Sequence, residues 1–127
     1  MRVATIAHAE KLRVFEPQEH SEEPIVETLC PAKNGRSRLQ WAGTNLLLLL
    51  SVDEEKCCII MVYDPQDGRL LGRVPQRRKL DRPNTMFFHS KFDLLLLAWQ
   101  DGAVVILTSV VRRPRKELKI FSTSRDL

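Results

Sequence analysis

The sequence has few of the residues that mark secreted and metal-binding proteins. It contains three cysteines, an odd number, and no Cys-x-x-Cys pair. Cys57 and Cys58 are adjacent, so on one strand they would point to opposite faces, which is poor geometry for a mutual disulfide. The three histidines are isolated from one another, and no spacing matches a zinc site. We therefore expect reduced thiols, a cytoplasmic or nuclear protein, and no metal site.

Long apolar segments are missing as well. The longest leucine run is Leu46–Leu50, whereas a membrane helix needs roughly 20 apolar residues. The first eleven residues contain no apolar core of the kind found in a signal peptide. We expect a soluble, unsecreted protein that does not bind membranes.

Catalytic constellations are absent too. Ser51 with Asp53, or His89 with Asp93, could be imagined as fragments of one. No nucleophile, base and orienting group can be assembled from them at a known spacing. The five glycines form no phosphate-binding loop. We expect a protein that is not an enzyme and has no cofactor.

The composition is that of a folded domain. Hydrophobic residues make up 43% of the 127 residues and charged residues 28%, so wholesale disorder is not expected. The length suits one domain, residues 1–127. The formal net charge of +4 permits nucleic acid or acidic partners without requiring them.

Three stretches of the chain have the pattern of a β-hairpin, in which a polar break separates two apolar segments. They cover residues 3–15, 46–63 and 94–107. The break in the third stretch contains Asp101-Gly102. Gly102 is expected to adopt the positive φ that a tight hairpin turn requires.

The hairpins recur at a regular interval. Their second segments end at Phe15, Tyr63 and Leu107, so the intervals are 63−15 = 48 and 107−63 = 44 residues. A period in the mid-forties is typical of four-stranded propeller blades. Further strands are predicted at Pro24–Leu29, Ser37–Trp41, Arg69–Val74, Asn84–Phe88 and Glu117–Phe121. We expect an all-β fold of antiparallel four-stranded blades, with a partial blade at 1–29 and blades at 37–74 and 84–121.

Two leucine runs, Leu46–Leu50 and Leu94–Leu97, do not alternate with polar residues. Such runs suit strands that are buried on both faces. A buried helix is the competing interpretation, because leucine favours helices. The nearby turn residues Gly43, Asn45 and Asp101-Gly102 and the short length of the runs favour strands.

The residues from Trp41 to Pro65 and from Phe88 to Val105 resemble blades of a WD-repeat β-propeller. The Gly-His and Trp-Asp dipeptides of that family are absent, and Asp101 alone matches the acidic residue of its hairpin turn. The resemblance implies a partial or incomplete β-propeller and a protein-interaction scaffold within a multi-subunit complex. It also implies other protein subunits as partners, one of which would complete the propeller.

The chain holds about two complete units and part of a third, whereas a propeller closes with several. An open stack exposes sheet faces and strand edges. Met1 falls almost directly on a strand, so we expect the chain to begin partway through a blade. Three explanations stay open: a piece of a longer protein, a ring completed by another chain, or a smaller sandwich that happens to repeat.

Basic residues form two clusters, which are the candidate interaction surface. They are Arg73, Arg77, Arg78, Lys79 and Arg82, and Arg112, Arg113, Arg115, Lys116 and Lys119. Clustered basic residues can neutralise phosphates, so the alternative function is a small basic β domain that binds RNA or DNA. Because loops alternate between the two faces of a propeller, we expect the clusters on opposite faces. That separation favours the scaffold over nucleic-acid binding.

Overall fold

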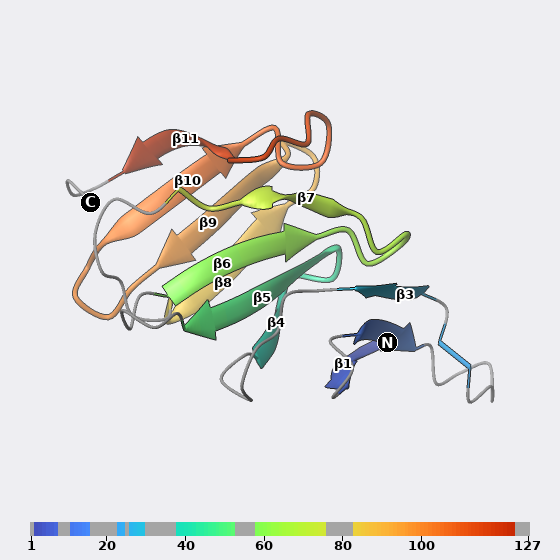
Figure 1. Ribbon diagram of the computed structural model, residues 1–127. Helices are drawn as coiled ribbons and strands as arrows, with labels where there is room; N and C mark the ends of the chain where they lie inside the picture. Colours follow the sequence, from blue (N-terminus) through green and yellow to red (C-terminus); the bar gives the residue numbers. More distant parts are fainter. Residues whose placement is uncertain are drawn as a thin grey trace.

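The computed structural model describes residues 2–7, 11–15, 23–24, 26–29, 38–52, 58–75 and 83–123. These residues form eleven strands in antiparallel sheets and contain no helix (Figure 1). The strands are β1 (Val3–Ala7), β2 (Lys11–Phe15), β3 (Val26–Leu29), β4 (Arg38–Ala42), β5 (Leu46–Val52), β6 (Cys58–Tyr63), β7 (Leu70–Arg73), β8 (Thr85–His89), β9 (Leu94–Ala98), β10 (Val104–Thr108) and β11 (Lys119–Thr123). The predicted all-β fold class is confirmed.

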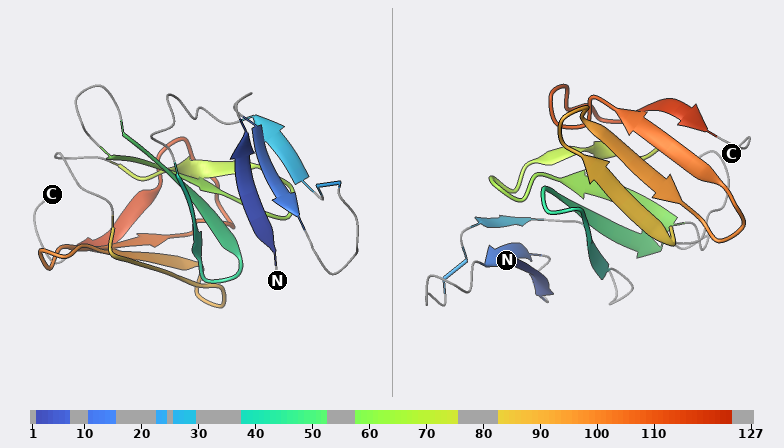
Figure 2. Two further views of the ribbon diagram at one scale, coloured as in Figure 1. Left: turned by 90° about the horizontal axis from the view of Figure 1, so that it is seen from below. Right: turned by 180° about the vertical axis from the view of Figure 1, so that it is seen from behind.

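The strands make three meandering sheets. Strands β1–β3 form the N-terminal sheet, β4–β7 form the middle blade, and β8–β11 form the C-terminal blade. Consecutive strands pair within each sheet, because short connections let a chain fold back beside itself. Figure 2 shows the sheets side by side in chain order, with the middle blade between the other two.

Every strand expected from the sequence is present, with small differences at the ends. The largest are at predicted Pro24–Leu29, which is Val26–Leu29, and predicted Glu117–Phe121, which is Lys119–Thr123. The second difference has a tertiary cause. Residues 115–118 bond to the neighbouring blade before β11 begins to pair with β10.

The two blades share the same register. Leu47 pairs with Tyr63 in the middle blade, and Leu95 pairs with Leu107 in the C-terminal blade. In each blade a β-bulge interrupts the pairing of the third and fourth strands, next to Tyr63 in one and next to Leu107 in the other. The repeat inferred from the spacing of Tyr63 and Leu107 is therefore a structural repeat.

Strand β5 is buried on both faces. Leu46, Leu48 and Leu50 belong to the core between the middle and C-terminal blades. Leu47 and Leu49 belong to the core between the middle blade and the N-terminal sheet. Relative exposure is 0% from Leu46 to Leu50, which confirms the prediction made from the leucine run.

Strand β9 departs from the prediction. Leu95 and Leu97 are buried against the middle blade, but Leu94, Leu96 and Ala98 on the opposite face are only partly buried. The expectation that Leu94–Leu97 is buried on both faces is wrong, because no described sheet packs against the second face of this blade.

The two blades are joined along the outer edge of β7. The N–H of Arg115 donates to the carbonyl of Leu71, that of Arg73 donates to Lys116, and that of Leu118 donates to Arg73. Gly72 makes this approach possible. A Cβ atom at Gly72 would lie 2.5 Å from the carbonyl oxygen of Arg115 and 2.7 Å from a Leu118 methyl carbon. We call residues 115–118 the locking segment.

Candidate functional site

The first basic cluster is described only at Arg73, while Arg77, Arg78, Lys79 and Arg82 lie outside the described residues. The Arg73 guanidinium is 3.3 Å from Glu117 Oε1, across the join between the blades. Both side chains are about half exposed, at 46% and 58%, so the pair contributes little to stability. It does place a carboxylate beside the guanidinium of Arg73.

The second cluster is described in full, and its backbone holds parts of the structure together. Arg115 and Lys116 belong to the locking segment. The Arg112 guanidinium donates to the carbonyl of Lys91 at 3.1 Å, and the N–H of Arg113 donates to Ser109. The side chains of Arg112, Arg113 and Lys116 are exposed, and that of Arg115 is partly buried.

Arg73 of the first cluster lies beside the second cluster, although the sequence predicts the two clusters on opposite faces. Arg73 lies beside Lys116, because β7 and the locking segment run parallel and exchange hydrogen bonds. The expectation of opposite faces is therefore wrong for Arg73. Counting loop alternation places the ends of strands but cannot place a segment that crosses to the next blade.

Asp93 is the one buried charged residue among those described, at 3% exposure. Its two carboxylate oxygens accept the N–H groups of Val111 and Arg112 at 2.8 and 2.9 Å, and its carbonyl accepts that of Ser109. Its φ of 52° lies in a region that aspartate tolerates. Asp93 thus ties the β8–β9 turn to the loop after β10.

A shallow cavity of about 260 Å³ opens where the turns of the middle and C-terminal blades converge. Its lining includes Arg2, Asn45, Asp64, Asp93 and Arg112. Asp64 and Asp93 both accept backbone N–H groups, so their oxygens shape the turns. Because positive and negative side chains both line the cavity, the lining favours neither anions nor cations.

The open face of the C-terminal blade, on the side away from the middle blade, is apolar. Leu94, Leu96, Ala98, Val104 and Ile106 lie on this face, each partly exposed. They are cross-strand neighbours, because Leu96 pairs with Ile106 and Ala98 pairs with Val104. We call this surface the open face.

Aromatic side chains border the open face. Phe87 pairs with Leu96 and is 53% exposed. Its ring meets that of His89 edge to face at 6.3 Å, and His89 meets Phe92 at 4.8 Å. Phe121, in the bulge of β11, is 65% exposed. Exposed aromatic residues grouped with aliphatic ones are the composition of a binding surface.

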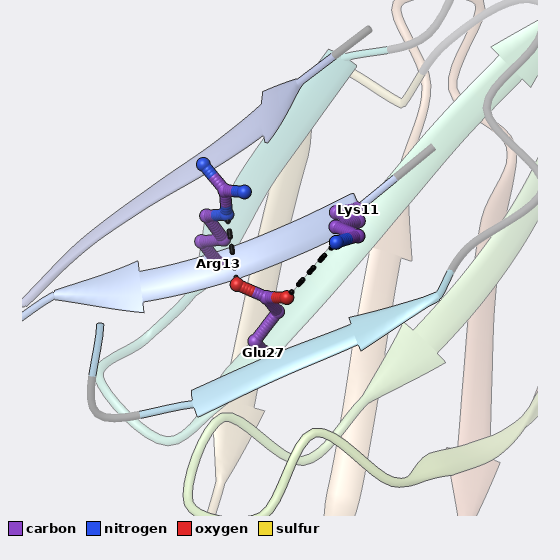
Figure 3. A network of polar contacts seen from close by, with 3 residues as sticks. All are labelled: Lys11, Arg13 and Glu27. Atoms are coloured by element: carbon purple, nitrogen blue, oxygen red, sulfur yellow. Dashed lines mark hydrogen bonds and ion pairs between the residues drawn. The ribbon is translucent and has the colours of Figure 1, made fainter. Parts of the chain in front are cut away.

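The outer face of the N-terminal sheet has the opposite character (Figure 3). Glu27 lies between Lys11 and Arg13, at 3.4 Å from Lys11 Nζ and 3.0 Å from Arg13 Nε. Desolvation acts to raise the pKa of Glu27, but the hydrogen bonds and positive charges of Lys11 and Arg13 outweigh it, so this pKa lies below its ordinary value. A charged cross-strand network is typical of a face in contact with water.

Sequence reasoning selected the basic residues and missed the open face. Its signal is present in Leu94–Leu97, for which the lack of alternation predicts burial on both faces. No group of three or more His, Cys, Asp or Glu residues in the described part of the chain is placed to hold a metal ion. Across the same residues, no helix has the length and hydropathy needed to span a membrane.

Models of known protein families do not match this chain, and no curated protein matches it either.

Proposed function

We propose that this protein is a non-catalytic protein-interaction scaffold, a subunit of a larger assembly built on WD-repeat-like β-propeller blades. The observation that carries the proposal is the open face. Its strands have the residue types of a buried sheet, yet Phe87 and Phe121 are more than half exposed. We propose that a partner protein binds to this face and covers it.

The driving force is hydrophobic. Moving one phenylalanine side chain from water into an interface stabilises the complex by about 1.5–3 kcal/mol. Phe87 and Phe121 stand on strands of a rigid sheet, so little conformational freedom is lost when they are covered. The aliphatic residues between them supply the flat centre of the contact.

The proposal includes no chemical step. The buried carboxylate of Asp93 is occupied by backbone N–H groups, and His89 Nδ1 accepts the N–H of Phe92 at 3.4 Å. Both groups of the imagined catalytic fragment therefore have structural partners. The expected reduced thiols belong to the same proposal, which puts the assembly in the cytoplasm or nucleus.

Nucleic-acid binding through the basic clusters has weaker support. Arg73 is paired with Glu117, and Arg112 donates to a carbonyl. Among the described residues of the two clusters, exposed Arg113 and Lys116 make a small positive surface, whereas specific protein–DNA interfaces need many phosphate contacts.

Site-specific photo-crosslinking in cells that express the protein tests the scaffold proposal. A photo-reactive phenylalanine analogue replaces Phe87 on the open face or Val3 on the outer face of the N-terminal sheet. We expect one discrete protein adduct from position 87, absent from position 3 and lost when Ile106→Glu is added. Equal adducts from both positions, or none from position 87, would contradict the proposal.

A further inference from the structure

The open face corresponds to a face that is buried elsewhere in the same chain. The shared register aligns Leu48 and Val62 of the middle blade with Leu96 and Ile106 of the C-terminal blade. Leu48 and Val62 are 0% exposed, because the C-terminal blade covers them. Leu96 and Ile106 occupy the same positions one blade later and are partly exposed.

The rest of each face follows the same correspondence. Leu50 and Ile60 align with Ala98 and Val104. The first pair is 0% and 3% exposed, and the second pair is partly exposed. The open face thus repeats the pattern of the corresponding face of the middle blade. That face packs against a four-stranded antiparallel sheet, the C-terminal blade.

The strongest correspondence is at the bulge in the fourth strand. Val62 pairs with Gly72 and Tyr63 with Leu70, so Leu71 is the bulged residue of the middle blade. Ile106 pairs with Ser122 and Leu107 with Ile120, so Phe121 is the bulged residue of the C-terminal blade. Leu71 is 0% exposed and Phe121 is 65% exposed. What covers Leu71 is the C-terminal blade with its locking segment.

The correspondence also shows how the next sheet would seat. Ser122 takes the position of Gly72, where a Cβ atom would lie 2.5 Å from the incoming carbonyl. A segment of the partner that pairs with β11 must therefore lie farther from β11 than the locking segment lies from β7.

A second copy of this chain is a poor occupant. The inner face of its C-terminal blade is already buried against its own middle blade. The outer face of its N-terminal sheet carries the Lys11–Glu27–Arg13 network, and burying that network under an apolar face costs more than the contact returns. The open faces of two copies also do not complement each other. The fourth strand of each face needs a locking segment from its partner, and neither open face supplies one.

Resting on the proposed function, we infer that the partner is another protein's four-stranded antiparallel β-sheet, which packs face to face on the open face as the next blade. Its inner strands present alternating aliphatic residues to Leu96 and Ile106. The segment before its outer strand lies over Phe121, as residues 115–118 lie over Leu71.

A fusion protein tests the fit. The probe is a second copy of residues 75–123 joined to Leu127 of the full chain, which offers a sheet already shaped to cover the middle blade. Ser122→Gly in the first copy gives β11 the glycine that the middle blade has at position 72. Alkylation of Ala98→Cys on the open face is followed by mass spectrometry, with Thr5→Cys on the outer face of the N-terminal sheet as the control. We expect alkylation at position 98 to slow at least about tenfold in the fusion, because a covered thiol reacts only after local opening.

The control position and a second variant complete the test. Alkylation at position 5 is expected to stay unchanged, and Phe121→Glu in the first copy is expected to restore the fast rate at position 98. An appended copy that leaves position 98 as reactive as in the unfused chain overturns the inference.

Two further results separate the inference from the proposed function. A reversible dimer of the unmodified chain in sedimentation, abolished by Phe121→Glu, would overturn the inference by assigning the face to a second copy. A heterologous crosslink from position 87 with no protection in the fusion would overturn the inference alone. Protection in the fusion with no crosslink in cells would overturn the proposed function.

Discussion

Gly72 lies directly against the backbone of Arg115, at the point where the outer strand of the middle blade meets the next blade. A Cβ atom there would come within 2.5 Å of a carbonyl oxygen. This contact joins the edge of the middle blade to the C-terminal blade, beside the apolar core that the two blades share.

Gly72→Ala is expected to destabilise the protein by about 1–3 kcal/mol, the usual cost of overpacking a tight contact. The measurement is the free energy of unfolding in denaturant. Leu70→Ala is the control, since Leu70 is on the same strand and 44% exposed. We expect a smaller loss there. Equal losses for the two variants would show that the close approach of Arg115 is not the cause.

Asp93→Ala is expected to cost about 2–3 kcal/mol, because two buried N–H groups lose their charged acceptor. Asp67→Ala is the matched control. Asp67 accepts a single N–H, that of Arg69, in an exposed turn, so a loss of about 1 kcal/mol is expected. Thermal melting compares them. If Asp93→Ala melts at or above the temperature of the control, the bonds to Val111 and Arg112 are not needed for stability.

Gly102 has a φ of 92°, which confirms the positive φ predicted from the Asp101-Gly102 pair. Gly102→Val is expected to destabilise the protein by more than about 1 kcal/mol, because a β-branched residue is strained in that region. Gly102→Asn is the control and should lose less, since asparagine visits positive φ more readily. A Gly102→Val protein with an unchanged melting temperature would contradict the assignment of this turn.

The lowered pKa of Glu27 predicts a pH dependence. A carboxyl whose pKa is depressed on folding stabilises the protein above its unfolded pKa, and this contribution is lost as the pH falls through its folded pKa. Glu27→Gln should therefore lower the melting temperature at pH 7 and have no effect at a pH well below the ordinary glutamate value of 4.5. High salt should shrink the difference at pH 7, because the pair is exposed. A deficit that persists at low pH would indicate lost packing instead.

Oligonucleotide binding separates the scaffold from its alternative. We expect binding no tighter than the non-specific level of about 10⁻⁴–10⁻⁶ M at physiological salt. Alanine replacement of Arg112 and Arg113 is compared with replacement of Arg77 and Arg78. Tight, steeply salt-dependent binding that both replacements weaken equally would favour the nucleic-acid function.

Local patterns in the sequence determined the strands and turns of this protein. The run Leu46–Leu50 predicted a strand buried on both faces, and Asp101-Gly102 predicted the turn that follows β9. These features depend on neighbours in the chain, whose preferences for backbone angles and for burial act over a few residues. The interval between Tyr63 and Leu107 predicted the repeat for the same reason, since each blade is a local meander.

Tertiary structure alone decided how the blades meet and which surfaces stay open. Leu94–Leu97 has the composition of β5, but half of it is accessible because no sheet among the described residues packs against its second face. The pairing of Arg73 with Glu117, the role of Asp93 and the need for glycine at position 72 also depend on contacts between distant parts of the chain. The residue types along the chain do not show which sheets come to lie side by side. The burial of a sheet face depends on what packs against that face and not on the face itself.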